Sequence, residues 1–147
     1  MSTLPVSVEF TIPGDPCAKG RPRMTRAGHA YTPAKTVSYE NLVKTIYMDK
    51  CGKCFEGPVS INIYAYFSIP KSVSKKKREE MLNGHILPTK KPDWDNIGKI
   101  ITDSLNSIAY EDDKQVVSAK VIKLYGVVPR VEVIISEALQ ERGNYLD

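Results

Sequence analysis

Residues 93–113 read DWDNIGKIITDSLNSIAYEDD, and this stretch determines most of what the sequence says about the fold. Apolar side chains recur in it at helical spacing, at Ile97, Ile100, Ile101, Leu105 and Ile108. Such a row forms one apolar stripe along a helix, which faces the core of the protein. The spacing therefore predicts an amphipathic helix from residue 95 or 96 to about residue 108.

Charged side chains gather in the same stretch. Asp93 and Asp95 lie two residues apart, and in an extended chain such side chains point the same way. Lys99 and Asp103 follow one and two helical turns after Asp95, so they share a helix face roughly opposite the isoleucine stripe. Carboxylates this close raise one another's pKa values unless a cation lies between them. A divalent metal such as Mg²⁺, which prefers oxygen ligands, suits this arrangement.

A second acidic pair, Asp112 and Asp113, ends the loop after this helix, and we expect that loop to return the pair to the same region. Simpler interpretations exist: a helix N-cap at Asp95, a row of ion pairs on the helix, and ordinary turn residues. A cap and a row of ion pairs do not require Asp93, however. The pattern alone leaves the structural and the catalytic interpretations open.

The flanking sequence alternates between strand-like and helix-like patterns. The predicted strands are residues 6–12, 59–67, 116–125 and 130–136. The predicted helices are residues 35–49, a short helix capped by Ser72 or Ser74 that ends at residue 82, and residues 95–108. We expect the last two strands to form a hairpin around residues 126–129. A long irregular segment precedes the first helix, up to about Pro33. This order predicts an α+β fold, with a mixed sheet of about four strands and helices packed on one face.

The composition is that of an ordinary globular protein, with 41% hydrophobic and 26% charged residues in a chain of 147. We expect one domain over residues 1–147, with a core from about residue 5 to residue 137 and a frayed C-terminal tail. The apolar runs are too short for a membrane span. The three cysteines, an odd number, argue against a disulfide framework, and residues 1–5 lack the features of an export signal. These features indicate a cytoplasmic protein.

The net charge of +4 is unevenly distributed. The basic residues that we expect to contact a phosphate backbone are Lys19, Arg21, Arg23, Arg26, Lys75, Lys76, Lys90 and Lys91. Clusters of this kind attract DNA and release counterions from it. The run that starts at Lys75 has an alternative interpretation as the solvated face of a helix. The cluster around Lys19 has loop composition instead, with no helix face to decorate.

Other residues have weaker signals. Cys51 and Cys54 have the spacing of a zinc pair, but no second pair follows. Trp94 either stacks on DNA or anchors its loop in the core, and we favour the core. Tyr31, in the basic loop, either stacks on an unpaired base or packs under the loop. Tyr64 and Tyr66 lie on the polar side of a predicted strand and indicate either a dimer face or a face covered by helices.

One motif joins the acidic residues: Pro92-Asp93-x-Asp95-Asn96-x-x-Lys99-x-x-x-Asp103-x-Leu105, followed by Asp112-Asp113-x-x-Val116. This motif resembles that of the RusA-type Holliday junction resolvases, endonucleases common in phages and prophages. The resemblance is strongest over residues 88–126. Gly98, inside the predicted helix, departs mildly from the pattern and costs about 1 kcal/mol of helix stability. Residues 84–92 have no clear counterpart.

The resemblance implies a single RusA-like nuclease domain that forms a homodimer and nicks four-way DNA junctions symmetrically, using Mg²⁺ or Mn²⁺. Carried over by position, the metal-binding residues would be Asp93, Asp95 and Asp113, with Lys99 as the catalytic lysine. The residues expected to support them without binding the metal are Asn96, Asp103 and Asp112. Two rival hypotheses remain: a non-catalytic protein that binds branched DNA, and a nuclease specific for flaps or replication forks.

Overall fold

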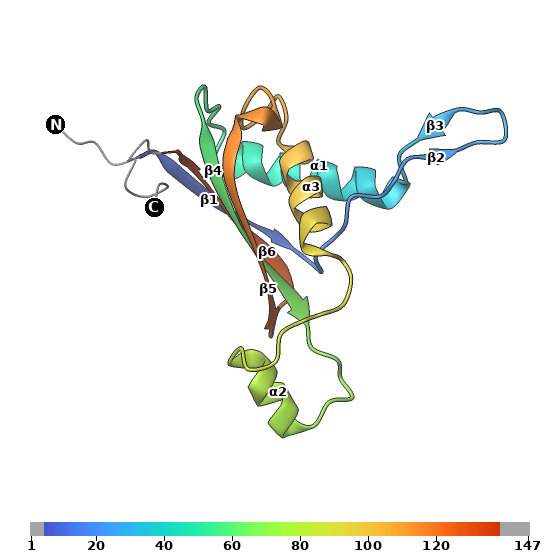
Figure 1. The fold of residues 1–147 in the computed structure, drawn as a ribbon, viewed down its shortest axis with the longest axis vertical. Coiled ribbons are helices and arrows are strands. Elements are labelled where there is room, and N and C mark those ends of the chain that lie inside the picture. Colours follow the sequence, from blue (N-terminus) through green and yellow to red (C-terminus); the bar gives the residue numbers. More distant parts are fainter. Residues whose placement is uncertain (1–4, 139–147) are drawn as a thin grey trace.

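The computed structural model describes residues 5–138, and a mixed four-stranded sheet lies at their centre (Figure 1). The strands are β1 (Ser7–Pro13), β4 (Val59–Ser68), β5 (Val116–Gly126) and β6 (Arg130–Glu137), in the order β1-β6-β4-β5. β6 pairs antiparallel with both β1 and β4, whereas β4 and β5 are parallel. The predicted α+β fold with a mixed sheet of four strands is confirmed.

The predicted hairpin between the last two strands is wrong. β5 and β6 do not pair, because β4 lies between them. The parallel pairing of β5 with β4 leaves the other edge of β4 free for an antiparallel strand, and β6 takes it. β6 then has hydrogen-bonded neighbours on both sides, and β5 becomes an edge strand with residues 117–120 exposed. The connection at residues 127–129 therefore carries the chain past the end of β4.

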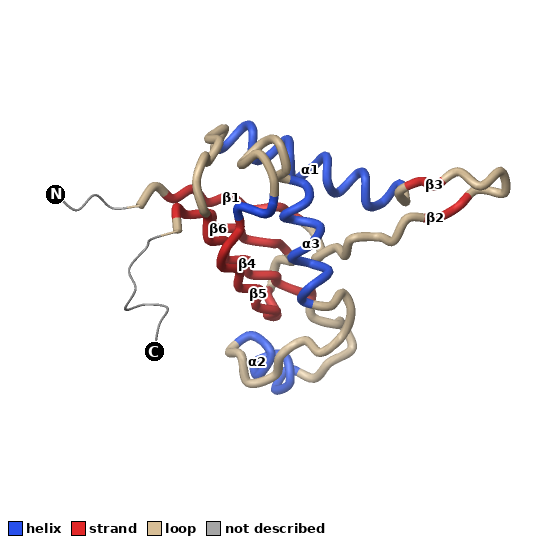
Figure 2. Tube along the Cα trace, turned by 45° about the horizontal axis from the view of Figure 1, so that its top comes forward, coloured by secondary structure: helices blue, strands red, loops and turns tan. Residues whose placement is uncertain are grey.

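Two helices, α1 (Ala34–Lys50) and α3 (Trp94–Ser104), cover one face of the sheet (Figures 1 and 2). α1 contacts β1, α3 contacts β5, and the two helices contact each other. The predicted isoleucine stripe is confirmed, because Ile97, Ile100 and Ile101 are fully buried. They meet the alternating buried residues of β4, from Val59 to Phe67. The core therefore lies between the two helices and the sheet.

The remaining elements lie outside this layer. α2 (Lys75–Leu82) lies beyond the end of β4 and β5, and the strands β2 (Arg23–Met24) and β3 (Ala30–Tyr31) form an arm that projects from the body (Figure 1). The arm was not predicted, because two-residue strands leave no alternation to detect. Of the two serines predicted to cap α2, Ser72 and Ser74, the N-cap is Ser74, whose hydroxyl accepts a hydrogen bond from the Lys77 backbone N–H at 3.2 Å.

α3 ends earlier than predicted, at Ser104 rather than near residue 108. Leu105 is its C-cap, and Ser107 adopts a left-handed conformation with φ 65°. Leu105 and Ala109 are nevertheless buried, so the apolar pattern continues through a turn instead of a helix. The tail was predicted to fray after residue 137, and residues 139–147 of it lie outside the described residues.

The opposite face of the sheet is open in the single chain. Tyr64 and Tyr66 of β4 are half-buried there, as are Ile122 and Ile134 on the neighbouring strands. The Arg130 guanidinium lies over the Tyr66 ring, 3.8 Å from its centroid. No helix covers this face among residues 5–138, which removes one of the two interpretations of Tyr64 and Tyr66. None of the described helices is both long enough and apolar enough to cross a membrane.

Candidate active site

The first turn of α3 presents two unused carboxylates. Asp93 occupies the N-cap position, with φ −72° and ψ 154°, but its side chain makes no capping hydrogen bond. Asp95 lies in the first turn, where the helix dipole favours negative charge. Both are exposed, and neither forms an ion pair with a described residue. The N-cap interpretation therefore does not account for these two residues.

The predicted row of charges along α3 is present in its second half. The Lys99 ammonium lies 3.2 Å from Asp103 Oδ1, one helical turn away. The Lys99 side chain is 57% exposed, whereas that of Asp103 is only 17% exposed. Asp103 thus positions the Lys99 ammonium through this contact, while most of the exposed Lys99 side chain remains open to a ligand.

Lys19 approaches the same carboxylate from another part of the chain. Its ammonium lies 2.7 Å from Glu40 Oε2 and 3.5 Å from Asp103 Oδ2. Its backbone N–H donates to the Asn96 carbonyl at 3.3 Å. Burial lowers the pKa of Lys19, but the hydrogen bond and charge of Glu40, with a contribution from Asp103, outweigh it and raise the pKa. Lys19 therefore joins α1 to α3, and its charge points into the protein.

The two residues of the second acidic pair, Asp112 and Asp113, lie in different environments. Asp112 caps the short 3-10 helix η1 (Asp113–Gln115): its carboxylate accepts from the Lys114 N–H at 3.0 Å, and Gln115 completes a capping box. Asp113 is half-buried beside Asp103. Burial raises the pKa of Asp113, as do its hydrogen bond with Asp103 and the negative charges of Asp112 and Asp103, whereas Lys99 acts in the opposite direction. The turn interpretation thus explains Asp112 but not Asp113.

These contacts place Asp113 beside the third turn of α3 rather than the first. Asp103 lies eight residues after Asp95, about 12 Å along the helix. Accordingly, residues 5–138 contain no group of three or more acidic, histidine or cysteine side chains gathered closely enough to hold a metal ion. The chemistry of the donors still fits a hard cation. Asp103 and Asp113 are neighbouring carboxyl groups, and the negative charge of Asp103 contributes to the raised pKa of Asp113; a divalent cation can offset such repulsion.

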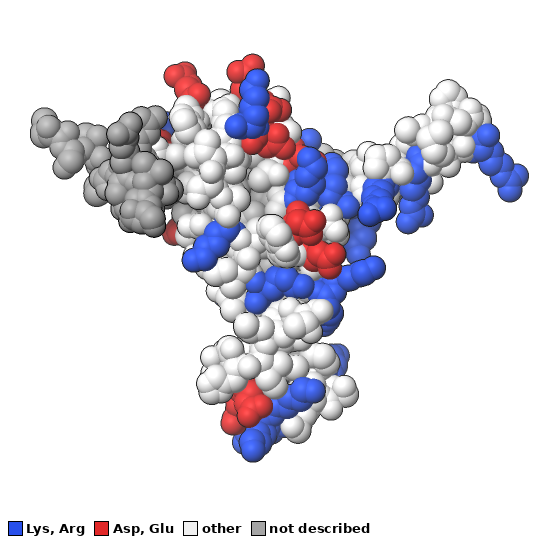
Figure 3. Space-filling model, viewed as in Figure 1, with Lys and Arg blue, Asp and Glu red and all other residues white. Residues whose placement is uncertain are grey.

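Some of the cations predicted to bind DNA border this acidic patch, and the others lie away from it, on the projecting arm and on α2 (Figure 1). Figure 3 shows the patch to the right of the molecule's centre, with Lys and Arg side chains above and below it. Arg21 and Lys91 line a surface groove together with Asp93 and Asn96. The remaining predicted residues are Arg23 and Arg26 of the arm, Lys75 and Lys76 of α2, and Lys90, whose ammonium lies 6.0 Å from the ring centroids of Phe67 and Tyr125.

The comparisons with known proteins assign this arrangement to a family. The family model of the endodeoxyribonuclease RusA matches residues 13–136, which include the groove, all of α3 and the pair at 112–113. The chain belongs to the RusA endodeoxyribonuclease family. A curated relative, the uncharacterized protein YqaN of Bacillus subtilis (strain 168), is 43% identical over 136 residues, which make up 88% of this chain and 96% of that protein. The resemblance seen in the motif is therefore confirmed.

Sequence reasoning misplaced one residue of this RusA-family site. Trp94 was expected in the core, but its side chain is 64% exposed. Trp94 is the first residue of α3, between Asp93 and Asp95, and it is exposed although it keeps the helical spacing of Ile97 and Ile101. It is also the single tryptophan of the chain. Its fluorescence therefore reports directly on the first turn of α3.

Two further residues beside the site carried no signal in the sequence. Lys35 is the second residue of α1 and lines the same groove as Arg21 and Lys91. Glu40 lies one turn further along α1 and pairs with Lys19. Both looked like ordinary surface charges of an amphipathic helix, because only the packing of α1 against α3 brings them to the site.

Proposed function

We propose that this RusA-family protein is a metal-dependent endonuclease that resolves four-way DNA junctions by paired symmetric nicks. The observation that carries the proposal is the composition of one surface. Exposed Asp93 and Asp95 open α3, Lys99 follows them, and the Asp103–Asp113 pair lies beyond it, with cations around the whole patch. Acidic side chains grouped within a basic surface suit a metal ion that acts on a polyanion.

The cofactor that we infer is Mg²⁺ or Mn²⁺, with Asp93, Asp95 and Asp113 as its protein ligands. Asp113 lies beside the third turn of α3 and the other two at the first turn, so the bound ion would have to draw these carboxylates together. Such an ion, when bound, activates water and offsets negative charge on the phosphoryl oxygens and the leaving group. The Lys99 ammonium, steadied by Asp103, stabilises the charge that develops on the phosphate during attack. Asn96, whose carbonyl receives the Lys19 N–H, and the capping residue Asp112 hold the surrounding backbone in place.

We also infer that two copies of the chain associate through the open face of the sheet. That face carries half-buried apolar side chains of Tyr64, Ile122 and Ile134 that no described helix covers. A twofold dimer presents two identical sites to a junction of matching symmetry, which accounts for paired nicks. All three cysteines are free thiols, which together with a DNA substrate supports a cytoplasmic location.

The test is a nicking assay on a synthetic four-way junction with Mg²⁺, alongside a linear duplex of the same sequence. We expect symmetric nicks in the junction alone, and no cutting without the metal. Asp93→Asn and Asp113→Asn should each retain junction binding and abolish cutting. Mg²⁺ should change the fluorescence of Trp94 in the wild type and much less in Asp93→Asn, which reports metal binding without catalysis.

Each alternative has its own result. Tight junction binding by a wild type that never nicks indicates a non-catalytic binding protein. Equal cutting of junction and linear duplex, or cutting only of flaps and forks, indicates a nuclease of different specificity. Normal cutting by Asp113→Asn would remove Asp113 from the metal-binding set, and a monomer in sedimentation at assay concentrations would contradict the dimer.

A further inference from the structure

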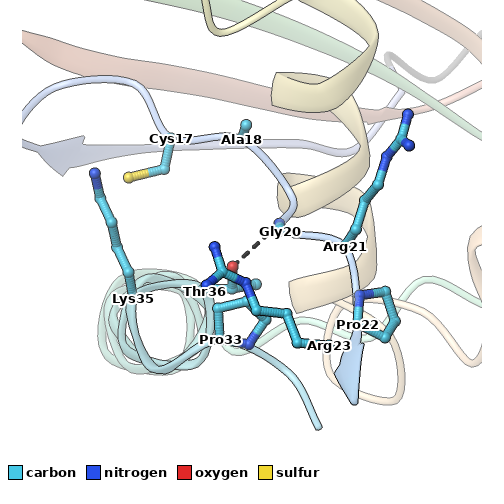
Figure 4. Close-up of a pocket in the computed structure, with 9 residues that line it drawn as sticks. All are labelled: Cys17, Ala18, Gly20, Arg21, Pro22, Arg23, Pro33, Lys35 and Thr36. Carbon is cyan, nitrogen blue, oxygen red and sulfur yellow. Dashed lines mark hydrogen bonds between the residues drawn. The ribbon is translucent and has the colours of Figure 1, made fainter. Parts of the chain in front are cut away.

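A continuous groove runs from the N-terminus of α1 to Asp93. It consists of two adjoining hollows, of about 390 and 670 Å³, which share Cys17, Ala18, Arg21 and Lys35 as lining residues. Lys91, Asp93 and Asn96 line the end near α3. Figure 4 shows the other end, with Lys35 beside Cys17 on one side and Arg21 on the opposite side. The groove therefore leads directly to the proposed catalytic carboxylates.

The groove carries positive charge that the protein does not neutralise. Arg21, Lys35 and Lys91 form no ion pair with any residue between 5 and 138. α1 adds to this charge, because Pro33 is its N-cap, no side chain caps it and no acidic residue occupies its first turn. The free N–H groups of that turn carry partial positive charge. Asp93 is the single acidic residue among the described residues that line the hollow near α3, so three cations there face one carboxylate and a further anion would reduce their repulsion.

The shape of the groove is fixed by contacts of residues 14–22, which we call the 14–22 loop. The Gly20 N–H donates to Thr36 Oγ1 at 3.1 Å, and Thr36 is buried in the first turn of α1. Lys19 connects the same loop to Glu40 and to α3. Lys19 and Arg21 therefore have opposite roles: the first is held inside the protein, and the second is left on the groove wall. These contacts fix the backbone of the 14–22 loop, so the fold determines where its cations lie.

We propose that this groove binds the backbone phosphate of the DNA strand next to the phosphate that is cut, and that Lys35 is a phosphate-binding residue. This proposal rests on the proposed function, because it places a neighbouring phosphate of the same strand in a groove that ends at Asp93. The two hollows that form the groove are open at the surface, so a continuous strand can pass through it. Charge recognition without base contacts suits an enzyme that reads the shape of a junction.

The test compares Lys35→Gln with Lys50→Gln, a matched change of the same charge in the last turn of α1, about 22 Å away along the helix. Binding of a labelled four-way junction is measured over a range of salt concentrations without Mg²⁺, so that no cutting occurs. Loss of one phosphate contact should lower the salt slope by about 0.9, which corresponds to about eightfold weaker binding at 0.1 M salt. Lys50→Gln should bind like the wild type, and Lys35→Arg should restore most of the affinity.

The outcomes separate this inference from the proposed function. If the wild type binds and nicks junctions but Lys35→Gln has the affinity and salt slope of Lys50→Gln, the groove does not bind the strand and the inference is overturned. If the wild type neither binds nor nicks junctions, the proposed function fails. The two variants are then compared on a single-stranded oligonucleotide: weaker binding by Lys35→Gln alone supports the groove, and equal binding overturns it. Matching thermal unfolding curves confirm that both variants are folded.

Discussion

Replacing Gly20 with alanine should disturb the 14–22 loop by steric conflict alone. A Cβ atom at this position would lie 2.4 Å from Thr36 Oγ1 and 3.1 Å from Pro33 Cγ. The first distance is far below any normal contact, so either the threonine hydroxyl or the loop must move. Either movement breaks the 3.1 Å hydrogen bond from the Gly20 N–H to Thr36 Oγ1.

The magnitude follows from what is lost. Thr36 is 4% exposed, so a hydroxyl left without its partner costs about 1–3 kcal/mol. Alanine also lowers the entropy of the unfolded chain, which returns about 0.4–1 kcal/mol. We therefore expect Gly20→Ala to lower the free energy of unfolding by about 1.5 kcal/mol. Junction affinity should fall as well, because Arg21 follows Gly20 directly on the groove wall.

Urea denaturation of four proteins measures this effect: the wild type, Gly20→Ala, Thr36→Ala and the double variant. Removal of the hydroxyl relieves the clash, so the double variant should be more stable than the sum of the single changes predicts, by about 1 kcal/mol. Gly57→Ala is the matched control, because nothing lies within 4 Å of its new Cβ. A Gly20→Ala protein within 0.5 kcal/mol of the wild type, or strictly additive changes, would refute the reasoning.

Two further predictions concern residues of the candidate site. Asp112→Ala should lower the free energy of unfolding by about 1 kcal/mol through loss of the η1 cap, yet retain nicking; an inactive but stable variant would contradict its structural role. Gly98→Ala should raise the free energy of unfolding by about 0.8 kcal/mol, since its Cβ would make an ordinary 3.4 Å contact with Val121; a destabilised variant in urea denaturation would show that α3 needs the closer approach.

The sequence predicted the main helices and strands well, because side chains buried in the core recur along the chain with the period of a helix or a strand. The isoleucines of α3 and the alternation in β4 each mark the face turned to the core. Alternation does not record which strand lies alongside. β5 and β6 have the same strand-like pattern whether they pair with each other or on either side of β4. The hairpin prediction failed for this reason, since only the long-range pairing with β4 decides the order.

The sequence predicted which types of residue form the candidate site, but not which of these side chains contact one another. Lys19 and Arg21 stand two residues apart in one basic segment, and nothing local distinguishes them. Lys19 forms ion pairs and Arg21 does not, because α1 and α3 bring Glu40 and Asp103 to Lys19 from elsewhere in the chain. Likewise, the loop after α3 returns Asp113 to this helix beside Asp103, and not to the first turn with Asp93 and Asp95, where the sequence predicted it. The contact between Asp113 and Asp103 determines which turn of α3 Asp113 lies beside, and the sequence does not show this contact.

The parallel pairing of β4 with β5 has a consequence for when the site can exist. α3 belongs to the connection between these two strands, and the Gln115 side chain reaches back to the Phe55 carbonyl, sixty residues earlier in the chain. Closing so long a segment is slow, and its entropy is repaid only when both strands are in register. An incomplete or newly emerging polypeptide therefore carries every acidic residue of the motif without the means to assemble them. We therefore expect the nuclease site to form in a single late folding step, at the same time as the complete four-stranded sheet.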